Sequence, residues 1–347
     1  MVALGDAAQA RSAHAALGRM LFGGMVAHLV GAAVRLGLPD ALGGGEADTA
    51  GLSRRLGTRA DTLERLLRAL AAVDLVAKST AGRYALTPAG HLLRTDHPDS
   101  LAAVARFYTD ALLMDSWRGL AQSVRDGSVA FERMHGMTFF EHLAGSPDRA
   151  EVFHNAMADR TRGTARVLPD VYDFGPFTTV VDVGGGDGTL LSAVLARHRH
   201  LNGVLLDTPG GAARAPAVLA AAGVADRCSV VSGDFFLSVP AGDVLLLKSI
   251  VHDWDDDRAA AVLSRCREAV SDGGRLLLVE PVLSDGFGAD ESAAPFLIDL
   301  NMLVNTGGRE RTRADFEALC TRSGFMLESV RTLPVSSEYM LVEAVPV

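Results

Sequence analysis

The chain has 347 residues, of which 48% are hydrophobic and 22% charged, and its formal net charge is −9. This length exceeds that of a usual single core, so two domains are expected, and the high apolar content predicts an oligomer. The acidic balance disfavours a general affinity for nucleic acid or for anionic lipid.

Neither a membrane span nor a disulfide framework is predicted. The uncharged stretch from Met20 to Val34 is shorter than the ~20 apolar residues of a membrane span. The first residues, Met1 to Ala15, lack the layout of a secretory signal, so we expect a cytoplasmic protein. The three cysteines are widely spaced and form no CxxC pair, which suggests buried thiols: Cys228, Cys266 and Cys320.

The N-terminal third is predicted to be helical. Apolar residues recur at helical spacing from Leu17 to Leu36, where small residues would let a partner helix approach closely. From Thr49 to Leu92 the pattern is helix, turn at Gly57, helix, and two short strands. These elements are expected at Asp61–Val73, Leu75–Lys78 and Arg83–Leu86. This order is the outline of a winged helix.

Helical patterns continue from Ser100 to Val171, with turn signals near Gly127, Gly136 and Gly145. Beyond Phe177, short apolar runs alternate with helices, which predicts a parallel α/β sheet buried on both faces. The expected strands are Thr178–Val183, Gly203–Leu206, Cys228–Val231, Asp243–Ile250 and Arg275–Val279.

Two further strands are expected at the end of the chain. Phe325–Thr332 and Glu338–Val345 are separated only by Leu333–Ser337, which leaves no room for a crossover helix. The last pair must therefore be antiparallel. The segments without an expected element are Gly43–Gly45 and Ser284–Ala294.

A glycine-rich loop, Asp182 to Gly188, directly follows a predicted strand and precedes a predicted helix. Glycine allows the backbone to turn tightly and to approach a ligand without an intervening Cβ. The spacing is GxGxG, and the third glycine of a dinucleotide motif would fall at Thr189, which weakens a nicotinamide interpretation. S-adenosylmethionine (SAM), another nucleotide and a purely structural turn all remain possible for this loop alone.

Acidic residues follow the next two strands. Asp207 lies about 20 residues after the glycines, where a carboxylate can accept both ribose hydroxyls. Asp234, within Gly233 to Phe236, could accept from an adenine amino group while Phe235 flanks the ring. Each aspartate alone could equally cap a helix, but their succession at strand ends favours an adenosine ligand.

The segment Lys248–Trp254, which contains His252, follows the start of the strand expected from Asp243. His252 there would share a sheet edge with the glycine loop, and a neutral imidazole can accept the proton of a phenol. Glu280 ends the next strand and could bond the other ring nitrogen of His252. Glu310 precedes a helix at Ala314–Ser323 and could face the substrate side of His252 or form a surface ion pair. Asp253 and Asp255 to Asp257 suit a solvated turn and helix start.

Aromatic and methionine side chains are candidates for an apolar slot that holds a flat ring, although such residues are more often core. They are Phe107, Tyr108, Met114, Trp117, Phe153, Met157, Phe296, Met302 and Asn305.

These stretches together resemble SAM-dependent O-methyltransferases of the caffeate and hydroxyneurosporene type, including bacterial enzymes that methylate aromatic natural products. The resemblance covers essentially the whole chain. The matching segments are Val181–Gly188, Gly233–Phe236, Lys248–Trp254, Leu278–Pro281 and Gly307–Thr312. In one departure, Thr208–Pro216 carries Gly210 and Gly211 where relatives are usually more helical.

The resemblance implies a homodimer with no metal, a small aromatic substrate, and a role in antibiotic or other secondary metabolism. It divides the chain into a winged-helix-like dimerisation domain (1–105), a helical bridge that contributes to the substrate pocket (106–170) and a Rossmann-like SAM-binding domain (171–347). Its catalytic residues would be His252, with Glu280 and Glu310 beside it. The cofactor residues would be Asp182, Gly184, Gly186, Asp207, Gly233, Asp234, Phe235, Lys248 and Ser249. Substrate contacts are expected from Phe153, Met157, Asp253, Met302 and Asn305.

Three other hypotheses compete with this one. A transcription regulator would use the arginines near the wing, Arg54, Arg55, Arg59, Arg65 and Arg68, but the net acidity opposes it. A non-catalytic SAM-binding scaffold is a second. The third is a relative that binds SAM and performs decarboxylation or hydroxylation.

Overall fold

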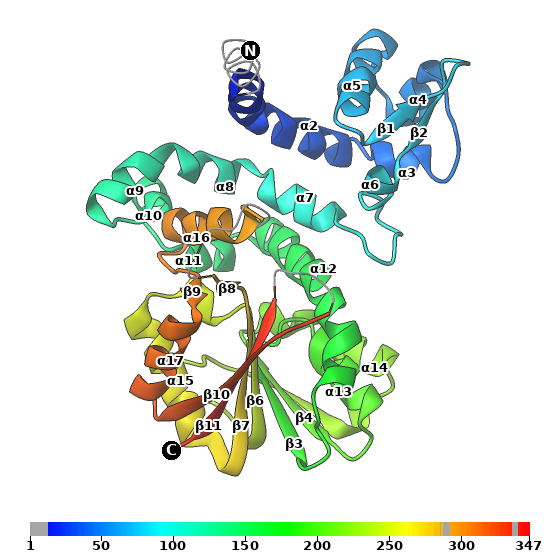
Figure 1. The fold of residues 1–347 in the computed structure, drawn as a ribbon. Helices are drawn as coiled ribbons and strands as arrows, with labels where there is room; N and C mark the ends of the chain where they lie inside the picture. Colours follow the sequence, from blue (N-terminus) through cyan, green and yellow to red (C-terminus); the bar gives the residue numbers. More distant parts are fainter. Residues whose placement is uncertain (1–12, 285, 287–291, 335–338) are drawn as a thin grey trace, which may run out of the picture. The chain divides into compact units, whose positions relative to one another are not determined.

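The computed structural model describes residues 13–284, 286, 292–334 and 339–347, and the chain forms two compact units, Met1–Ala111 and Leu112–Val347 (Figure 1). Most of the N-terminal stretch 1–15, much of the segment 284–294 and Glu338 therefore lie outside the described residues. Each unit is considered separately.

The first unit contains the predicted order of two helices and two strands. Asp48 caps the first of these helices, α4 (Thr49–Leu56), by accepting a hydrogen bond from the backbone N–H of Gly51. Gly57, with a φ of 63°, ends the same helix. The strands β1 and β2 pair antiparallel. The elements are α2 (Gly23–Arg35), α3 (Leu38–Leu42), α4 (Thr49–Leu56), α5 (Ala60–Ala72), β1 (Val76–Lys78), β2 (Tyr84–Leu86), α6 (Pro88–His91) and α7 (Ala102–Tyr108).

The start of the first unit carries an apolar surface that is exposed to solvent. No single described helix is long and apolar enough to span a bilayer; a helix over Ala13–Leu21 and α2 reach that length only together, and they are bent by 46°. Exposed large side chains gather on these two helices: Leu17, Met20, Leu21, Phe22, Met25 and Val26. Contiguous exposed apolar surface of this kind marks an interaction site.

Five short helical segments and one long helix, α12, precede the sheet of the second unit. Gly127 and Gly136 end α9 and α10 with φ values of 71° and 70°, so these predicted turns are confirmed. Thr138 and Glu141 form a capping box at the start of α11. The segments are α8 (Ala111–Ser116), η1 (Trp117–Gly119), α9 (Leu120–Asp126), α10 (Ala130–His135), α11 (Phe139–Ala144) and α12 (Pro147–Val171).

A seven-stranded sheet follows, in the order β10-β11-β7-β6-β3-β4-β5. β3 to β7 are parallel, whereas β11 runs antiparallel to both β7 and β10, which confirms the predicted topology and the antiparallel final pair. The strands are β3 (Thr179–Val183), β4 (Asn202–Asp207), β5 (Cys228–Ser232), β6 (Gly242–Lys248), β7 (Val270–Glu280), β10 (Phe325–Thr332) and β11 (Met340–Pro346).

Helices cover both faces of this sheet (Figure 1). Alternate residues of each strand point to opposite faces, so Val180 packs into one core cluster and Val181 into the other. The first cluster contains side chains of α12, α13 and α14, and the second those of α15 and α17. The helical elements after α12 are α13 (Thr189–Arg197), η2 (Gly211–Arg214), α14 (Ala215–Ala221), η3 (Ala225–Arg227), η4 (Val251–Asp253), α15 (Asp256–Ala269), α16 (Ala294–Asn305) and α17 (Arg313–Arg322).

A small parallel pair, β8 (Val282–Leu283) with β9 (Arg311–Thr312), was not anticipated from the sequence. β8 begins two residues after Glu280, and β9 begins directly after Glu310. The pair therefore brings these two glutamates together, although thirty positions separate them along the chain.

The exposed surface of the first two helices predicts that Met25→Glu weakens self-association. Met25 is 67% exposed, and a symmetric dimer would bury it twice. Since burial of one such side chain contributes roughly 1.5–3 kcal/mol and two are buried, dimerisation should weaken by at least about a hundredfold. Sedimentation equilibrium measures this directly. The control Met326→Glu, at a methionine 55% exposed on β10, should leave association unchanged, and equal effects of both changes would contradict the prediction.

Candidate active site

The carboxyl ends of β3, β4, β6 and β7 lie at one edge of the sheet because these strands are parallel and in register. The loops that leave them carry the glycine loop, Asp207, the segment after Lys248, and Glu280. Ligands of such sheets bind at this edge.

The glycine loop requires glycine for two distinct reasons. Gly184, Gly186 and Gly188 have φ values of 73°, 58° and 79°, which side chains rarely adopt. At Gly185 the φ is ordinary, but a Cβ would lie 2.8 Å from Oδ2 of Asp182. The loop therefore rests directly on that carboxylate.

Asp182 is a buried acid beneath this loop. It is 2% exposed, and its Oδ2 has no hydrogen-bond partner among the described groups. Burial and the nearby Asp207 raise the pKa of Asp182 to about 7, against the lowering effect of Lys248. An unsatisfied acceptor under a ligand loop suits a donor supplied by the ligand.

Asp207 ties the loop to the next strand. Its Oδ2 accepts from the backbone N–H of Gly186 at 2.8 Å, and its Oδ1 accepts from that of Thr208 at 2.7 Å. The departure noted after Asp207 has a physical reason here, because a Cβ on Gly211 would lie 2.0 Å from Oδ1 of Asp207. Gly211 thus permits close packing on the carboxylate.

The third predicted cofactor segment follows β5. Gly233 donates its backbone N–H to the carbonyl of Asp207 at 2.9 Å. Oδ1 of Asp234 accepts from the backbone N–H of Phe236 at 2.8 Å, so the aspartate orders its own turn. The ring of Phe235 lies 3.7 Å from the position a Cβ would take on Gly184. Phe235 therefore stands beside the glycine loop.

Lys248 and Ser249 end β6 on the same edge. Ser249 has a φ of 54°, an uncommon conformation for a residue with a side chain that often marks functional sites. Its hydroxyl accepts from Nζ of Lys248 at 2.9 Å and lies 3.2 Å from the hydroxyl of Tyr339. The sequence did not indicate Tyr339, because it approaches from the other end of the chain.

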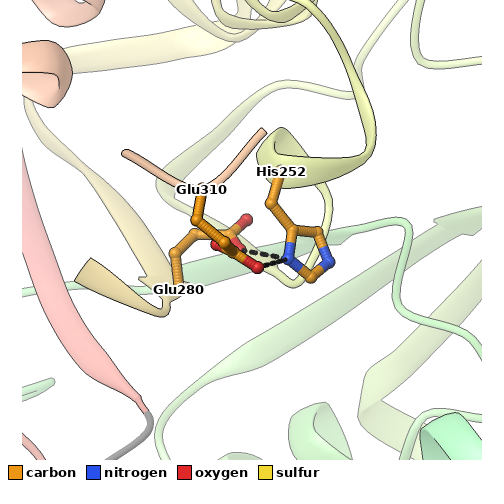
Figure 2. Close-up of side chains that lie close together, drawn as sticks. All are labelled: His252, Glu280 and Glu310. Carbon is orange, nitrogen blue, oxygen red and sulfur yellow. Dashed lines mark hydrogen bonds and ion pairs between the residues drawn. The ribbon is translucent and has the colours of Figure 1, made fainter. Parts of the chain in front are cut away.

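His252 is held by carboxylates on one side of its ring (Figure 2). Nδ1 lies 2.8 Å from Oε1 of Glu310, whereas Oε2 of Glu280 is 3.8 Å from the same nitrogen. In Figure 2 both glutamates lie on the Nδ1 side, and Nε2 points away from them. His252 is 8% exposed, Glu310 2% and Glu280 0%.

The expected roles of the two glutamates are therefore corrected. The hydrogen-bond partner of Nδ1 of His252 is Glu310 and not Glu280. Glu310 is buried on the Nδ1 side of the ring, so it neither faces the substrate side nor forms a surface ion pair. Glu280 instead directs Oε1 to the backbone, where it accepts from Ile250 at 2.9 Å and from Val251 at 2.8 Å. This fixes the turn that carries His252.

The motif around Glu310 packs directly on the backbone of that turn. A Cβ on Gly308 would lie 2.0 Å from the carbonyl oxygen of His252, so only glycine fits. Arg311, 1% exposed, donates to the carbonyls of Val251 at 2.9 Å and Trp254 at 3.0 Å. Arg311 also pairs with Asp256 at 2.8 Å. These bonds lock Glu310 and His252 into one unit.

The acids around His252 change its charge state. Burial alone would lower the pKa of His252, but Glu310, Glu280 and Asp253 together raise it to about 10. Burial raises the pKa of Glu280, opposed by His252. The three acids therefore favour the protonated, imidazolium form of the ring.

Asp253 was predicted to lie in a solvated turn and also to contact the substrate; the first prediction was wrong, and the second stays a prediction. Its side chain is 17% exposed, and its Oδ1 lies 3.8 Å from Nε2 of His252. Burial raises the pKa of Asp253 to about 7, although His252 opposes this. Asp253 is therefore the acid on the open side of the imidazole. Asp255, by contrast, caps α15 as expected.

Four of the five predicted substrate residues lie on two helices. Phe153 and Met157 belong to α12, and Met302 and Asn305 to α16, where Met302 is 7% and Asn305 2% exposed. Oδ1 of Asn305 has no hydrogen-bond partner among the described groups. Of the other slot candidates, Phe107 and Tyr108 lie in α7, Met114 in α8, Trp117 in η1 and Phe296 in α16.

A chain of aromatic rings joins the substrate and cofactor candidates. Phe153 contacts Phe140 with ring centroids 6.2 Å apart, and Phe140 lies 5.3 Å from Trp254. Trp254 in turn lies 6.3 Å from Phe235. Phe140 was not singled out in the sequence, because it belongs to none of the motifs.

The His252, Glu280 and Glu310 ligand atoms lie within 4.8 Å of one another, close enough to share a metal ion. The 2.8 Å contact between His252 and Glu310 is instead a direct hydrogen bond, which a metal would have to replace. The arrangement suits a positioned base.

Comparison with known proteins places this site in a family. The O-methyltransferase domain model matches residues 117–326, and the O-methyltransferase dimerisation domain model matches residues 19–96. The chain belongs to this O-methyltransferase family, which confirms the predicted enzyme class.

Individual relatives cover nearly the whole chain. It is 44% identical over 333 residues to an O-demethylpuromycin-O-methyltransferase of Streptomyces alboniger, covering 94% of this chain and 88% of that protein. It is 39% identical to the phenazine O-methyltransferase PhzM of Lysobacter antibioticus, covering 95% of each. The structure of NcsB1, a neocarzinostatin-biosynthesis O-methyltransferase in complex with SAM and 2-hydroxy-5-methyl naphthoic acid, superposes with a TM-score of 0.76 at 34% identity, covering 93% of this chain and 96% of that one. SAM as the cofactor is thereby confirmed.

Removal of the Glu310 charge should lower the pKa of His252. In Glu310→Gln the strongest favourable charge is lost while shape is kept, so the pKa should fall well below about 10, as NMR titration of the ring would show. The pKa of His252 in the folded protein is about 10, above the unfolded value of ~6.5, so its protonation contributes to the free energy of unfolding. This contribution is complete below pH ~6.5 and is lost as the pH rises from there through about 10. Urea unfolding should show this alkaline loss in the parent and a smaller one in the variant. An unchanged titration would contradict the assignment.

Proposed function

We propose that this protein transfers the methyl group of SAM to a phenolic hydroxyl of a small aromatic or polyketide-type natural product, with His252 as the general base. The observation that carries the proposal is the anchored imidazole: Glu310 holds Nδ1 at 2.8 Å and leaves Nε2 on the open side.

The residues at the sheet edge fit the cofactor. The carboxylate of Asp207 can accept hydrogen bonds from the ribose hydroxyls, next to a loop that has no Cβ at Gly186. Asp234 would accept from the adenine amino group, and the ring of Phe235 would flank the adenine. Oδ2 of Asp182 offers an acceptor that has no hydrogen-bond partner among the described groups. When bound there, SAM supplies an electrophilic methyl group on a sulfonium, whose departure needs no metal.

His252 would act by holding a proton at Nε2. The surrounding acids raise its pKa to about 10, so at neutral pH the ring must first give up the Nε2 proton before it can act as a base. Once it has done so, proton exchange with a phenol, whose pKa is ~10, is nearly balanced in free energy. Glu310 fixes the tautomer with the proton on Nδ1, and Glu280 fixes the turn. Positioning of the oxygen can contribute up to ~7–11 kcal/mol, and base catalysis a further ~10²- to 10⁴-fold.

The substrate would lie against the helical bridge, residues 106–170, together with α16. Phe153 and Met157 offer an apolar surface, and Asn305 offers a buried acceptor without a described partner. Asp253, beside Nε2, would contact the substrate hydroxyl region. We further propose that the homodimer works in the cytoplasm, since its cysteines are free thiols, which suits a reducing compartment.

His252→Ala should abolish most turnover without loss of cofactor binding. The base is removed, so kcat should fall by ~10²- to 10⁴-fold, whereas the Kd for S-adenosylhomocysteine (SAH), measured by calorimetry, should stay within about twofold. The control His198→Ala removes a histidine that bonds the carbonyl of Pro169 and should retain full activity. A large loss of SAH affinity in His252→Ala would refute the role of base.

The reaction itself is tested with a panel of phenols and SAM, followed by mass spectrometry. The expected product gains one CH₂ on a hydroxylated aromatic compound and forms together with SAH. SAM binding with a product that has lost CO₂ or gained oxygen would instead establish the non-methyltransfer alternative, and no SAM binding would overturn the proposal.

A further inference from the structure

An arginine that follows Asp207 joins two elements that are far apart in the chain. Arg214 lies at the end of η2, and Nη1 of its guanidinium donates to Oδ1 of Asn155 in α12. Nη2 of the same guanidinium donates to Oδ2 of Asp187, in the glycine loop, at 3.4 Å. One side chain therefore ties α12 to the glycine loop.

The backbone of Arg214 is held firmly, although its guanidinium is not. Ala212 and Ala215 are 4% and 0% exposed, and a Cβ on Gly188 would lie 3.7 Å from the Cβ of Ala215. The side chain of Arg214 is 45% exposed. All three residues after Gly210 belong to the segment Thr208–Pro216, in which this sequence departs from its relatives. A half-exposed side chain on a fixed backbone can break and re-form its bonds without a change of fold.

Helix α12 crosses the carboxyl edge of the sheet. Arg160 of this helix donates to the hydroxyl of Tyr339 at 2.8 Å, and the ring of Tyr339 lies 4.4 Å from Nζ of Lys248, at the end of β6. His154 of the same helix lies near the end of β4: burial lowers the pKa of His154, and the charge of Asp207 opposes this. A molecule bound along this edge would therefore lie between α12 and the strand ends.

We propose that Arg214 is a latch for cofactor exchange: SAM enters and SAH leaves only while the bonds of Arg214 to Asn155 and Asp187 are broken. This inference rests on the proposed function, because it assumes that the adenosine binds at Asp207 and the glycine loop. Arg214 is a positioning residue. It holds α12 against the glycine loop and takes no part in the methyl transfer.

A latch and a binding contact change different constants. A latch that closes over the free and the bound protein alike slows entry and release by the same factor, so its loss speeds both and leaves the Kd unchanged. A contact with the cofactor stabilises the bound state alone, so its loss raises the Kd, mainly through the dissociation rate. The two rate constants together therefore separate the two roles.

In Arg214→Gln the association and dissociation rate constants for SAH should both rise by roughly threefold to tenfold, as expected for the loss of a half-exposed ion pair and one hydrogen bond. The Kd should stay within about twofold. Surface plasmon resonance on the immobilised full-length chain gives both rate constants, and calorimetry checks the Kd.

Asn155→Ala provides a second test from the other side of the latch. It removes the acceptor on α12 and leaves Arg214 in place, so both rate constants should rise in the same way. Because the two changes break the same bond, the double variant should be no faster than Arg214→Gln alone.

Arg197→Gln is a matched control. Arg197 also pairs with an acid of α12, its Nε lying 2.6 Å from Oδ1 of Asp170, and its side chain is 64% exposed. It ends α13, which runs from the glycine loop towards the opposite edge of the sheet. Its loss should leave both rate constants as they are in the parent.

The outcomes distinguish the inference from its premise. Unchanged rates in Arg214→Gln would overturn the latch, and a higher Kd carried by dissociation alone would make Arg214 a cofactor contact instead. Equal acceleration in Arg197→Gln would indicate general loosening of α12 and would also count against the latch. None of these results touches the proposed function, which fails first if the parent does not bind SAH. Should Arg214→Gln fold poorly, Asn155→Ala decides alone.

Discussion

The parallel register of β3, β4, β6 and β7 is the constraint on which the site depends. Val181, for example, pairs with Val204 on one side and Leu245 on the other, so the three strands end together. Each strand is buried on both faces, and only its carboxyl end can present polar groups without a desolvation cost. Groups that are far apart in the chain therefore meet along one edge, and a shift of register in any strand would separate them.

The second requirement is that buried charge be fixed in place. His252, Glu280 and Glu310 are all almost fully buried, and charges in such places are costly unless bonded. The structure satisfies them largely through the backbone: Glu280 accepts from the turn that carries His252, and Arg311 binds the carbonyls of the same turn. The result is an imidazole with one defined orientation, at the cost of a glycine at position 308 that no other residue can replace.

Local sequence patterns predict much of this molecule, but they do not predict its long-range pairings. The glycine loop, the strands and the antiparallel tail follow from apolar runs, glycine and short connections, which are properties of neighbouring residues. The β8–β9 pair could not be predicted, because strands of two residues carry no periodicity. For the same reason the partner of Nδ1 was assigned to Glu280 instead of Glu310, and Asp253 was placed in solvent. Tyr339 carried no local signal, since its partners Arg160 and Lys248 come from distant elements.

The charge state of His252 also bears on which hydroxyl this site suits. Proton transfer between two groups is nearly balanced in free energy when their pKa values are close, and three surrounding acids raise the pKa of His252 to about 10, close to that of a phenol. An aliphatic hydroxyl is a far weaker acid, so the same ring would leave its proton almost wholly on oxygen. The acids that make the site costly to bury are thus the feature that adapts it to phenols. The acids around the imidazole ring, rather than any contact with the aromatic body, would set this part of the preference. The helices that carry Phe153 and Asn305 would set the shape of the molecule that reaches the ring.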